Sequence, residues 1–241
     1  MARERGLRIG TFVGAPVIIE STFLLLAAYV VGSAILRGGV DAAPGALILV
    51  GVVFAAIVIH EFGHAGVAAA LNIPSRRIVL TFFGGYVQFA RQPKHGWQEI
   101  AVSAAGPGAN LASYILVASI MPLLTSTLWL TPNDTSFLGA LNTFGVISLM
   151  LGLFNLLPGF PLDGGHILRA ALSYVMQRNT ARIVTAITGL LLTAALIAYA
   201  IWQELLWTVF VAGLLGLAAW AELRAARYER QRAASDTTSN A

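Results

Sequence analysis

An apolar run from Gly45 to Leu71 constrains this chain more than any other stretch. It is longer than the roughly 20 residues that a helix needs to cross a bilayer. Its only ionisable side chains are His60, Glu61 and His64. Ionisable groups inside a membrane are costly unless they are paired or bound, so these three are expected to share a functional site. The run therefore predicts a spanning helix that carries a polar site.

The composition places the whole chain in the membrane class. Hydrophobic residues make up 57% of its 241 residues, and only 11% are charged, whereas soluble domains carry about 25% charged residues. The net charge is +4. The charged residues lie between apolar segments and at the two ends, without interleaved aromatic residues, so they do not indicate nucleic-acid binding. The absence of cysteine excludes disulfides, thiolate ligands and cysteine nucleophiles.

We predict an α-helical polytopic membrane protein with about six transmembrane helices and a small membrane-associated β-hairpin. The spans are Ser21–Leu36, Gly45–Leu71, Trp97–Leu124, a fourth from Phe137 to the break at Pro158, Thr180–Trp202 and Leu205–Leu223. A short helix is expected to resume over Ile167–Met176. Residues that favour strands flank Gly84 and Gly85, which predicts the hairpin. Phe12–Ile19 is expected to form a short strand or an interfacial segment.

Residues 1–223 are expected to form a single membrane-embedded domain, followed by a basic and polar tail, residues 224–241, without ordered structure. With the N-terminus inside, all but Arg37 of the 15 Lys and Arg residues fall in cytoplasmic regions. This asymmetry predicts a multi-pass protein of the plasma membrane with both termini cytoplasmic. It also places His60, His64 and Asp163 in the cytoplasmic half of the membrane.

His60, Glu61 and His64 spell H-E-x-x-H, a spacing that puts both imidazoles on one face of a helix and suits a zinc ion. Glu61 would lie where it can take a proton from a water. A catalytic zinc site needs a third protein ligand. Asp163 is the candidate by depth and apolar flanks, although an aspartate before two glycines is also typical of a helix cap or turn. His166 is a competing ligand.

Three motifs in order resemble the site-2 protease family of intramembrane zinc metalloproteases: HEFGH in one span, GPGAN in the next, and NLLPGFPLDGG after it. The opening GTFVGAPVIIESTF and the segment GGYVQF are similar to the family's N-terminal pattern, so the resemblance covers about residues 9–175. It implies that His60, His64 and Asp163 bind one Zn2+ and that Glu61 is the general base and acid. The protein is expected to be a minimal form of the family, without the PDZ or cystathionine-synthase-type modules of some relatives.

The resemblance also suggests further residues. Asn155, eight residues before Asp163, is a candidate oxyanion or substrate donor; its alternative role is to satisfy backbone groups freed at the Pro158 break. Gly85, Tyr86 and Gln88 of the hairpin are candidates for pairing with an extended substrate. Gly106 and Asn110 are expected to permit close packing against the histidine helix. Glu20, where many relatives have histidine, marks either the interface or the site.

The predicted function is hydrolysis of a peptide bond in or near the transmembrane segment of a membrane-anchored protein, in regulated intramembrane proteolysis. The substrate is expected to be already cleaved by another protease. Two alternatives stay open: a non-catalytic relative that binds transmembrane clients, and a polytopic ion-coupled transporter, in which intramembrane histidine and acid would mark an ion path. The predicted partners are the substrate and the lipid bilayer, with no nucleic acid.

Overall fold

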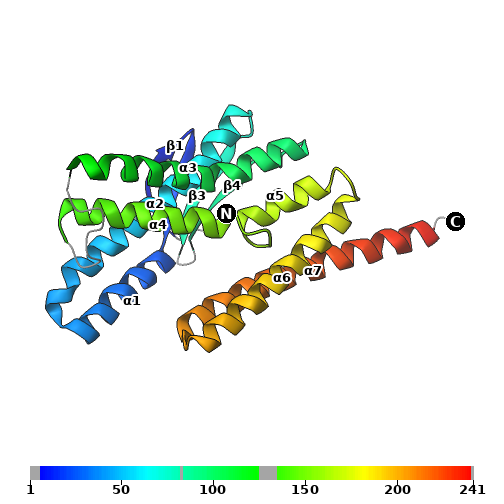
Figure 1. The fold of residues 1–241 in the computed structure, drawn as a ribbon. Coiled ribbons are helices and arrows are strands. Elements are labelled where there is room, and N and C mark those ends of the chain that lie inside the picture. Colours follow the sequence, from blue (N-terminus) through cyan, green and yellow to red (C-terminus); the bar gives the residue numbers. More distant parts are fainter. Residues whose placement is uncertain (1–5, 82–83, 125–134, 240–241) are drawn as a thin grey trace. The chain divides into compact units, whose positions relative to one another are not determined.

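The computed structural model describes residues 6–81, 84–124 and 135–239, and for 233–239 the backbone alone. Figure 1 shows the order of the elements along the chain. The chain divides into two compact units, described separately below. The first contains Met1–Gln92 and Ala105–Leu153, and the second contains Pro93–Ala104 and Phe154–Ala241. The single domain predicted for residues 1–223 stays a prediction.

Six helices of the described chain are long and apolar enough to cross a membrane, which confirms the predicted fold class. The helices are α1 (Ser21–Gly38), the 3-10 turn η1 (Val40–Ala42), α2 (Ala43–Ala70), α3 (Gly96–Leu124), α4 (Phe137–Asn155), α5 (Asp163–Leu172), α6 (Arg178–Trp202) and α7 (Leu206–Ser239). Of these helices, α5 alone lies outside the six candidate spans, and η1 and α2 together make up the second span, Val40–Ala70.

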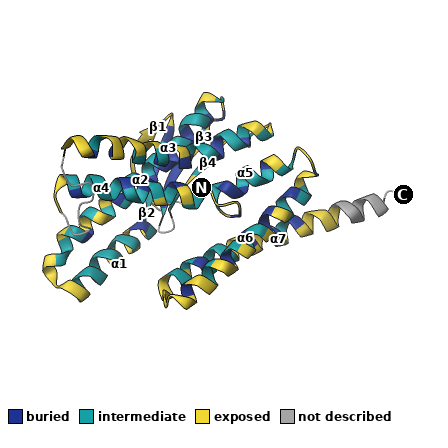
Figure 2. Cartoon of the chain, viewed as in Figure 1, coloured by how far each residue is buried: buried dark blue, intermediate teal, exposed yellow. Residues whose placement is uncertain are grey.

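Large apolar side chains of these helices are exposed, and Figure 2 shows stretches coloured as exposed along α1, α6 and α7. Leu36 is 89% exposed and Leu206 is 82% exposed. A soluble protein rarely shows apolar surface of this extent, because each such side chain would face water. In a bilayer the same surface contacts lipid, which agrees with the hydropathy of the helices.

A four-stranded sheet, in the order β1-β2-β3-β4, covers part of α2 in the first unit. Its strands are β1 (Gly6–Phe12), β2 (Ala15–Glu20), β3 (Ser75–Thr81) and β4 (Gly84–Phe89). The predicted hairpin is confirmed as the antiparallel pair β3 and β4. Val17, Ile57 and Ile78 share one buried cluster, and the Phe12 ring stacks on Phe62 of α2 with centroids 3.9 Å apart.

The sheet has one more hairpin than the sequence analysis predicted. Val13 and Gly14 join β1 to β2 with φ values of 43° and 81°, the left-handed conformation that a two-residue hairpin turn requires. A β-branched residue such as Val13 seldom adopts this conformation. Val-Gly is also not the Asn-Gly pair that usually marks such a turn, so the hairpin was not predicted. β2 then pairs in parallel with β3, a contact that local sequence does not encode.

Two boundaries also differ from the prediction. α5 begins at Asp163, four residues earlier than expected, because Gly164 and Gly165 belong to its first turn. A Cβ at Gly165 would lie 2.6 Å from the Gly159 carbonyl carbon, so the glycines serve close packing rather than a turn. The tail predicted to be without ordered structure is helical as far as the structure describes it, since α7 continues to Ser239.

Candidate metal centre

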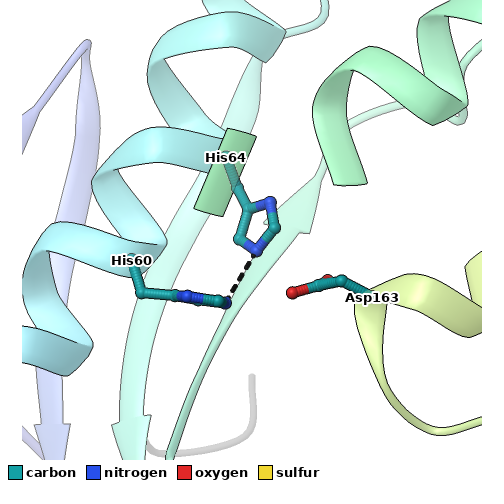
Figure 3. A group of neighbouring side chains, drawn as sticks. All are labelled: His60, His64 and Asp163. Atoms are coloured by element: carbon teal, nitrogen blue, oxygen red, sulfur yellow. Dashed lines mark hydrogen bonds between the residues drawn. The ribbon is translucent and has the colours of Figure 1, made fainter. Parts of the chain in front are cut away.

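His60 and His64 project from one face of α2 in the first unit, and their rings lie edge to face, with centroids 4.8 Å apart and an angle of 81° between the ring planes. The two Nε2 atoms lie 3.1 Å apart (Figure 3). Both side chains are buried, at 6% and 8% exposure, and so is Glu61 between them in sequence, at 4%. The one-turn spacing of H-E-x-x-H therefore produces the convergent imidazole pair that it predicts.

The imidazole pair fits a zinc ion. Two nitrogens on bonds of about 2.05 Å at a tetrahedral angle lie about 3.3 Å apart, close to the observed 3.1 Å between the two Nε2 atoms. The backbone of Gly106 in α3 leaves room for these rings and nothing more. A Cβ at position 106 would lie 2.6 Å from Cε1 of His64 and 2.8 Å from Nε2 of His60.

The GPGAN segment packs closely against α2, as expected. A Cβ at Gly63 would lie 2.9 Å from the carbonyl carbon of Ala105, so the two helices approach through small residues. Asn110 is fully buried, and its Nδ2 donates to the Ala56 carbonyl at 3.3 Å. Together these contacts fix the rotation of α2 about its own axis, and with it the direction of both imidazoles.

Strand β4 covers Glu61. A Cβ at Gly85 would lie 2.6 Å from Oε1 of Glu61 and 2.7 Å from its Cδ, so the strand backbone approaches the carboxyl group as closely as a glycine allows. The Glu61 carboxyl group therefore lies between the imidazole helix and an edge strand. Such a position brings a proton acceptor next to a backbone that can hold an extended chain.

The two other hairpin candidates differ from each other. Tyr86 lies opposite Val79 of β3 in the strand register, and its side chain is 43% exposed. Gln88 accepts a hydrogen bond at its Oε1 from Nε of Arg77, at 2.7 Å across the β3–β4 pair. Gln88 is therefore already used to hold β4 on β3, and any substrate contact would compete with Arg77.

Asp163 belongs to the second unit, where it is the first residue of α5; Figure 3 labels it with the histidines. The loop before it wraps closely over this first turn, because a Cβ at Gly164 would meet the carbonyl carbon of Leu156 at 2.5 Å. His166, one turn later, packs its ring against Phe160 with centroids 5.0 Å apart. Burial lowers the pKa of His166 below 6.5, and the charge of Arg169 lowers it further.

Asn155 is the last residue of α4, half-buried, and directly precedes the turn at Leu156. Glu20 ends β2 and directly precedes α1. For both residues, and for Asp163 as a ligand, the functional role stays a prediction. One pair was missed altogether: Glu99 and Arg169 form an ion pair in the second unit. A glutamate within an apolar stretch, as in WQEIAV, was the available signal.

Comparison with known proteins gives a consistent result. Peptidase family M50 matches residues 47–131 and 131–199. A protein of Synechocystis sp. is 32% identical over 225 residues, which cover 89% of this chain and 53% of that protein. The zinc metalloprotease MJ0392 of Methanocaldococcus jannaschii is 34% identical over 169 residues, covering 69% of this chain and 45% of that protein.

The chain thus spans about half the length of the curated relatives it matches. Among solved structures, the site-2 protease from Methanocaldococcus jannaschii is similar, with a TM-score of 0.68 and 26% sequence identity. That similarity covers 90% of this chain and 95% of the solved one. The imidazole pair lies within the first segment matched by the family, residues 47–131.

Proposed function

Because this chain belongs to Peptidase family M50, we propose that it is an intramembrane zinc metalloprotease. It hydrolyses a peptide bond in or near the transmembrane segment of a membrane-anchored protein. The observation that carries this proposal is the buried imidazole pair of His60 and His64, at 3.1 Å, with the buried Glu61 next to it. Three ionisable groups in an apolar helix have a cost that a bound metal ion offsets.

His60, His64 and Asp163 are the proposed zinc ligands. Two imidazoles and one carboxylate are a ligand set that suits a catalytic zinc site and leaves one position for water. Each of these three side chains offers a nitrogen or oxygen atom that can bind a metal ion. The HEFGH and LDGG motifs supply it in the order that the family resemblance implies.

Bound zinc would polarise a water and the substrate carbonyl. Glu61 then does the proton transfer: its carboxylate accepts a proton from the attacking water and passes it to the leaving nitrogen. Burial of Glu61 below the edge of β4 keeps bulk water away from this carboxylate. The Asn155 amide is proposed to donate a hydrogen bond to the substrate backbone.

A transmembrane substrate must first unwind, because a helix hides its carbonyls in its own hydrogen bonds. We assign the holding of the unwound segment to the edge of β4 that faces away from β3, the outer edge of the sheet as described. The Ala90 N–H donates to the Pro74 carbonyl at 2.8 Å, so by alternation Gln88 and Tyr86 direct their backbone groups toward β3, and Gly85 and Val87 direct theirs outward. The backbones of Gly85 and Val87 are therefore the proposed pairing groups, whereas Tyr86 and Gln88 hold the strand in place.

The proposed location is the plasma membrane, with both termini in the cytoplasm and a membrane protein as substrate. The test of the function uses the purified full chain in detergent with a single-span substrate. We expect cleavage by the wild type, none by Glu61→Gln, and none after zinc chelation, with recovery on adding zinc. Cleavage by Glu61→Gln at the wild-type rate would contradict the proposed role of this carboxylate.

The same experiment separates the two alternatives. A non-catalytic client binder would retain the substrate without cutting it in both variants. A transporter would show ion flux in vesicles that does not depend on Glu61. Membership of a peptidase family and the intact Glu61 favour neither of them.

A further inference from the structure

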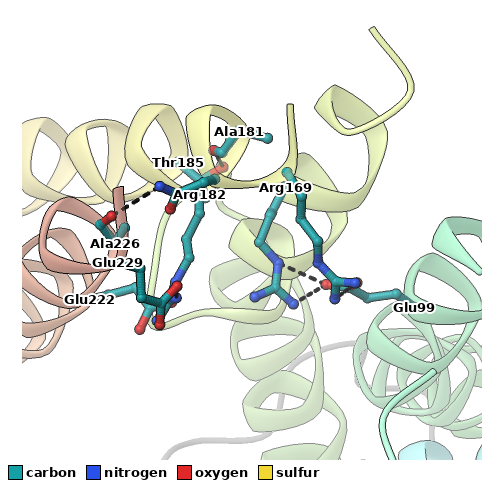
Figure 4. A network of polar contacts seen from close by, with 10 residues as sticks. Glu99, Arg169, Ala181, Arg182, Thr185, Glu222, Ala226 and Glu229 are labelled. Carbon is teal, nitrogen blue, oxygen red and sulfur yellow. Dashed lines mark hydrogen bonds and ion pairs between the residues drawn. The ribbon is translucent and has the colours of Figure 1, made fainter. Parts of the chain in front are cut away.

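Glu99 is a buried carboxylate near the start of α3, in the second unit, and two arginines bind it. It is 8% exposed. Nε of Arg169, in α5, donates to its Oε1 at 2.9 Å, and a second guanidinium nitrogen of Arg169 bonds to the same oxygen (Figure 4). Nη2 of Arg178 lies 3.5 Å from Oε2. Removing Arg169, the main partner, would leave the buried charge of Glu99 largely uncompensated, which destabilises the folded protein.

Arg169 also contacts the loop that leads into α5. Its guanidinium carbon lies 5.5 Å from the centre of the Phe160 ring, within the range of a cation–π contact. Gly165 packs against the backbone of Gly159 and Phe160. The loop before Asp163 and the helix after it therefore form one packed segment, residues 156–172, which Arg169 joins to α3.

α3 itself is continuous from Gly96 to Leu124, and it contributes residues to both units. Gly106, against which His60 and His64 pack in the first unit, follows Glu99 by two turns of this helix. In an α-helix this separation amounts to about 10 Å of rise. α3 thus carries both Gly106, which packs against the imidazoles, and Glu99, which binds Arg169 of α5.

We propose that Glu99 and Arg169 are positioning residues for the metal site. Their ion pair fixes α5, and with it the Asp163 carboxylate, to the helix that also packs against the two histidines. This inference rests on the proposed function, because it assumes that Asp163 is a zinc ligand. Neither residue touches the substrate or the metal; both act through the placement of α5.

A purely structural role is the alternative, and the chain offers a matched control for it. Arg182 in α6 donates from Nη1 to Oε2 of Glu229 at 2.9 Å and also binds Glu222, both in α7 (Figure 4). It is half-buried like Arg169, it lies in the same unit, and Glu222 and Glu229, which it binds, lie outside residues 156–172. Loss of Arg182 should lower stability without changing the place of Asp163.

The test measures zinc affinity by chelator competition, and thermal unfolding of the zinc-free protein, for the full chain in detergent. We expect Arg169→Gln and Glu99→Gln to bind zinc roughly 10-fold to 100-fold more weakly than the wild type, as is typical when partners of metal ligands are removed. Arg182→Gln should lower the unfolding temperature yet keep zinc affinity within about twofold. Arg169→Gln with wild-type zinc affinity would overturn the proposal.

Arg169→Lys covers the case in which Arg169→Gln does not fold. It keeps the positive charge for Glu99 but loses the planar fork and the contact with Phe160. We expect an intermediate loss of zinc affinity with nearly unchanged unfolding; an unchanged affinity would refute the positioning role. If the wild type itself binds zinc no better than a His60→Ala variant, the proposed function fails instead, so the two failures can be told apart.

Discussion

At the scale of single residues, Gly106 decides whether the imidazole pair can form. Any side chain there would lie within 2.8 Å of Nε2 of His60. We therefore predict that Gly106→Ala displaces the rings and weakens zinc binding roughly 10-fold to 100-fold, measured by chelator competition. Gly108→Ala is the control on the same helix, because a Cβ at Gly108 meets nothing within 4 Å. Equal zinc affinity in the two variants would show that the rings tolerate the added methyl group.

His166 gives a second prediction at this scale. Burial first, and then the charge of Arg169, lowers the pKa of His166 in the folded protein below 6.5. The unfolded chain therefore binds a proton at this residue at a higher pH than the folded chain does, so stability falls as the pH drops below about 6.5. We expect the unfolding temperature of the zinc-free protein to decrease over that range.

His166→Gln should reduce this pH dependence, because it removes the titrating group and keeps a polar side chain of similar size. The measurement compares thermal unfolding of the two proteins at the same series of pH values in detergent. His95→Gln is the control, since His95 is exposed in the loop before α3. A His166→Gln protein with the wild-type slope would assign the pH dependence to other groups.

At the scale of elements, the role of the outer edge of β4 can be tested at one position. Val87 directs its N–H away from β3 by the alternation described above, so Val87→Pro removes an outward donor while sparing the β3 ladder. One lost substrate hydrogen bond is worth about 1 kcal/mol, and we expect kcat/KM for a transmembrane substrate to fall about fivefold or more.

Val87→Ala is the matched control for that strand. It loses the packing of Val87 against the buried cluster of the sheet but keeps the N–H. Zinc affinity should be unchanged in both variants, since neither touches the imidazoles. If Val87→Ala and Val87→Pro lower cleavage equally, packing rather than strand pairing explains the loss.

The elements also show what the sequence could and could not predict. Helices such as α2 and α6 were predicted within a few residues, because length and hydropathy determine a spanning helix. β1 was missed, since its turn uses Val13 in a left-handed conformation. The end of α7 was missed because polar composition alone indicated no order.

The candidate site divides in the same way. The H-E-x-x-H spacing predicts the imidazole pair locally, since a helix sets the positions of i and i+4. The approach of Gly85 to Glu61 and the pairing of Glu99 with Arg169, 70 positions apart, depend on tertiary packing. No local pattern encodes such contacts, so they became visible only with the fold.

At the scale of the whole molecule, the charges predict one orientation across the membrane. All but Arg37 of the 15 Lys and Arg residues fall on the side assigned to the cytoplasm, and this bias favours both termini inside. The chain has no cysteine, so single cysteines can be labelled without background. Val40 precedes α2 on the opposite side and is 75% exposed, and Val175, between α5 and α6, is 79% exposed.

We predict that an impermeant maleimide labels Val40→Cys in intact cells, and labels Val175→Cys only after the membrane is opened. Gln203→Cys and Lys94→Cys, both exposed, should behave like Val40→Cys and Val175→Cys respectively, because an even number of spans separates the two positions of each pair. Labelling of Val175→Cys in intact cells would reverse the orientation. It would also place the metal ligands in the outer half of the membrane. His60 and His64 lie in the second half of α2, and α2 ends on the same side of the membrane as Val175.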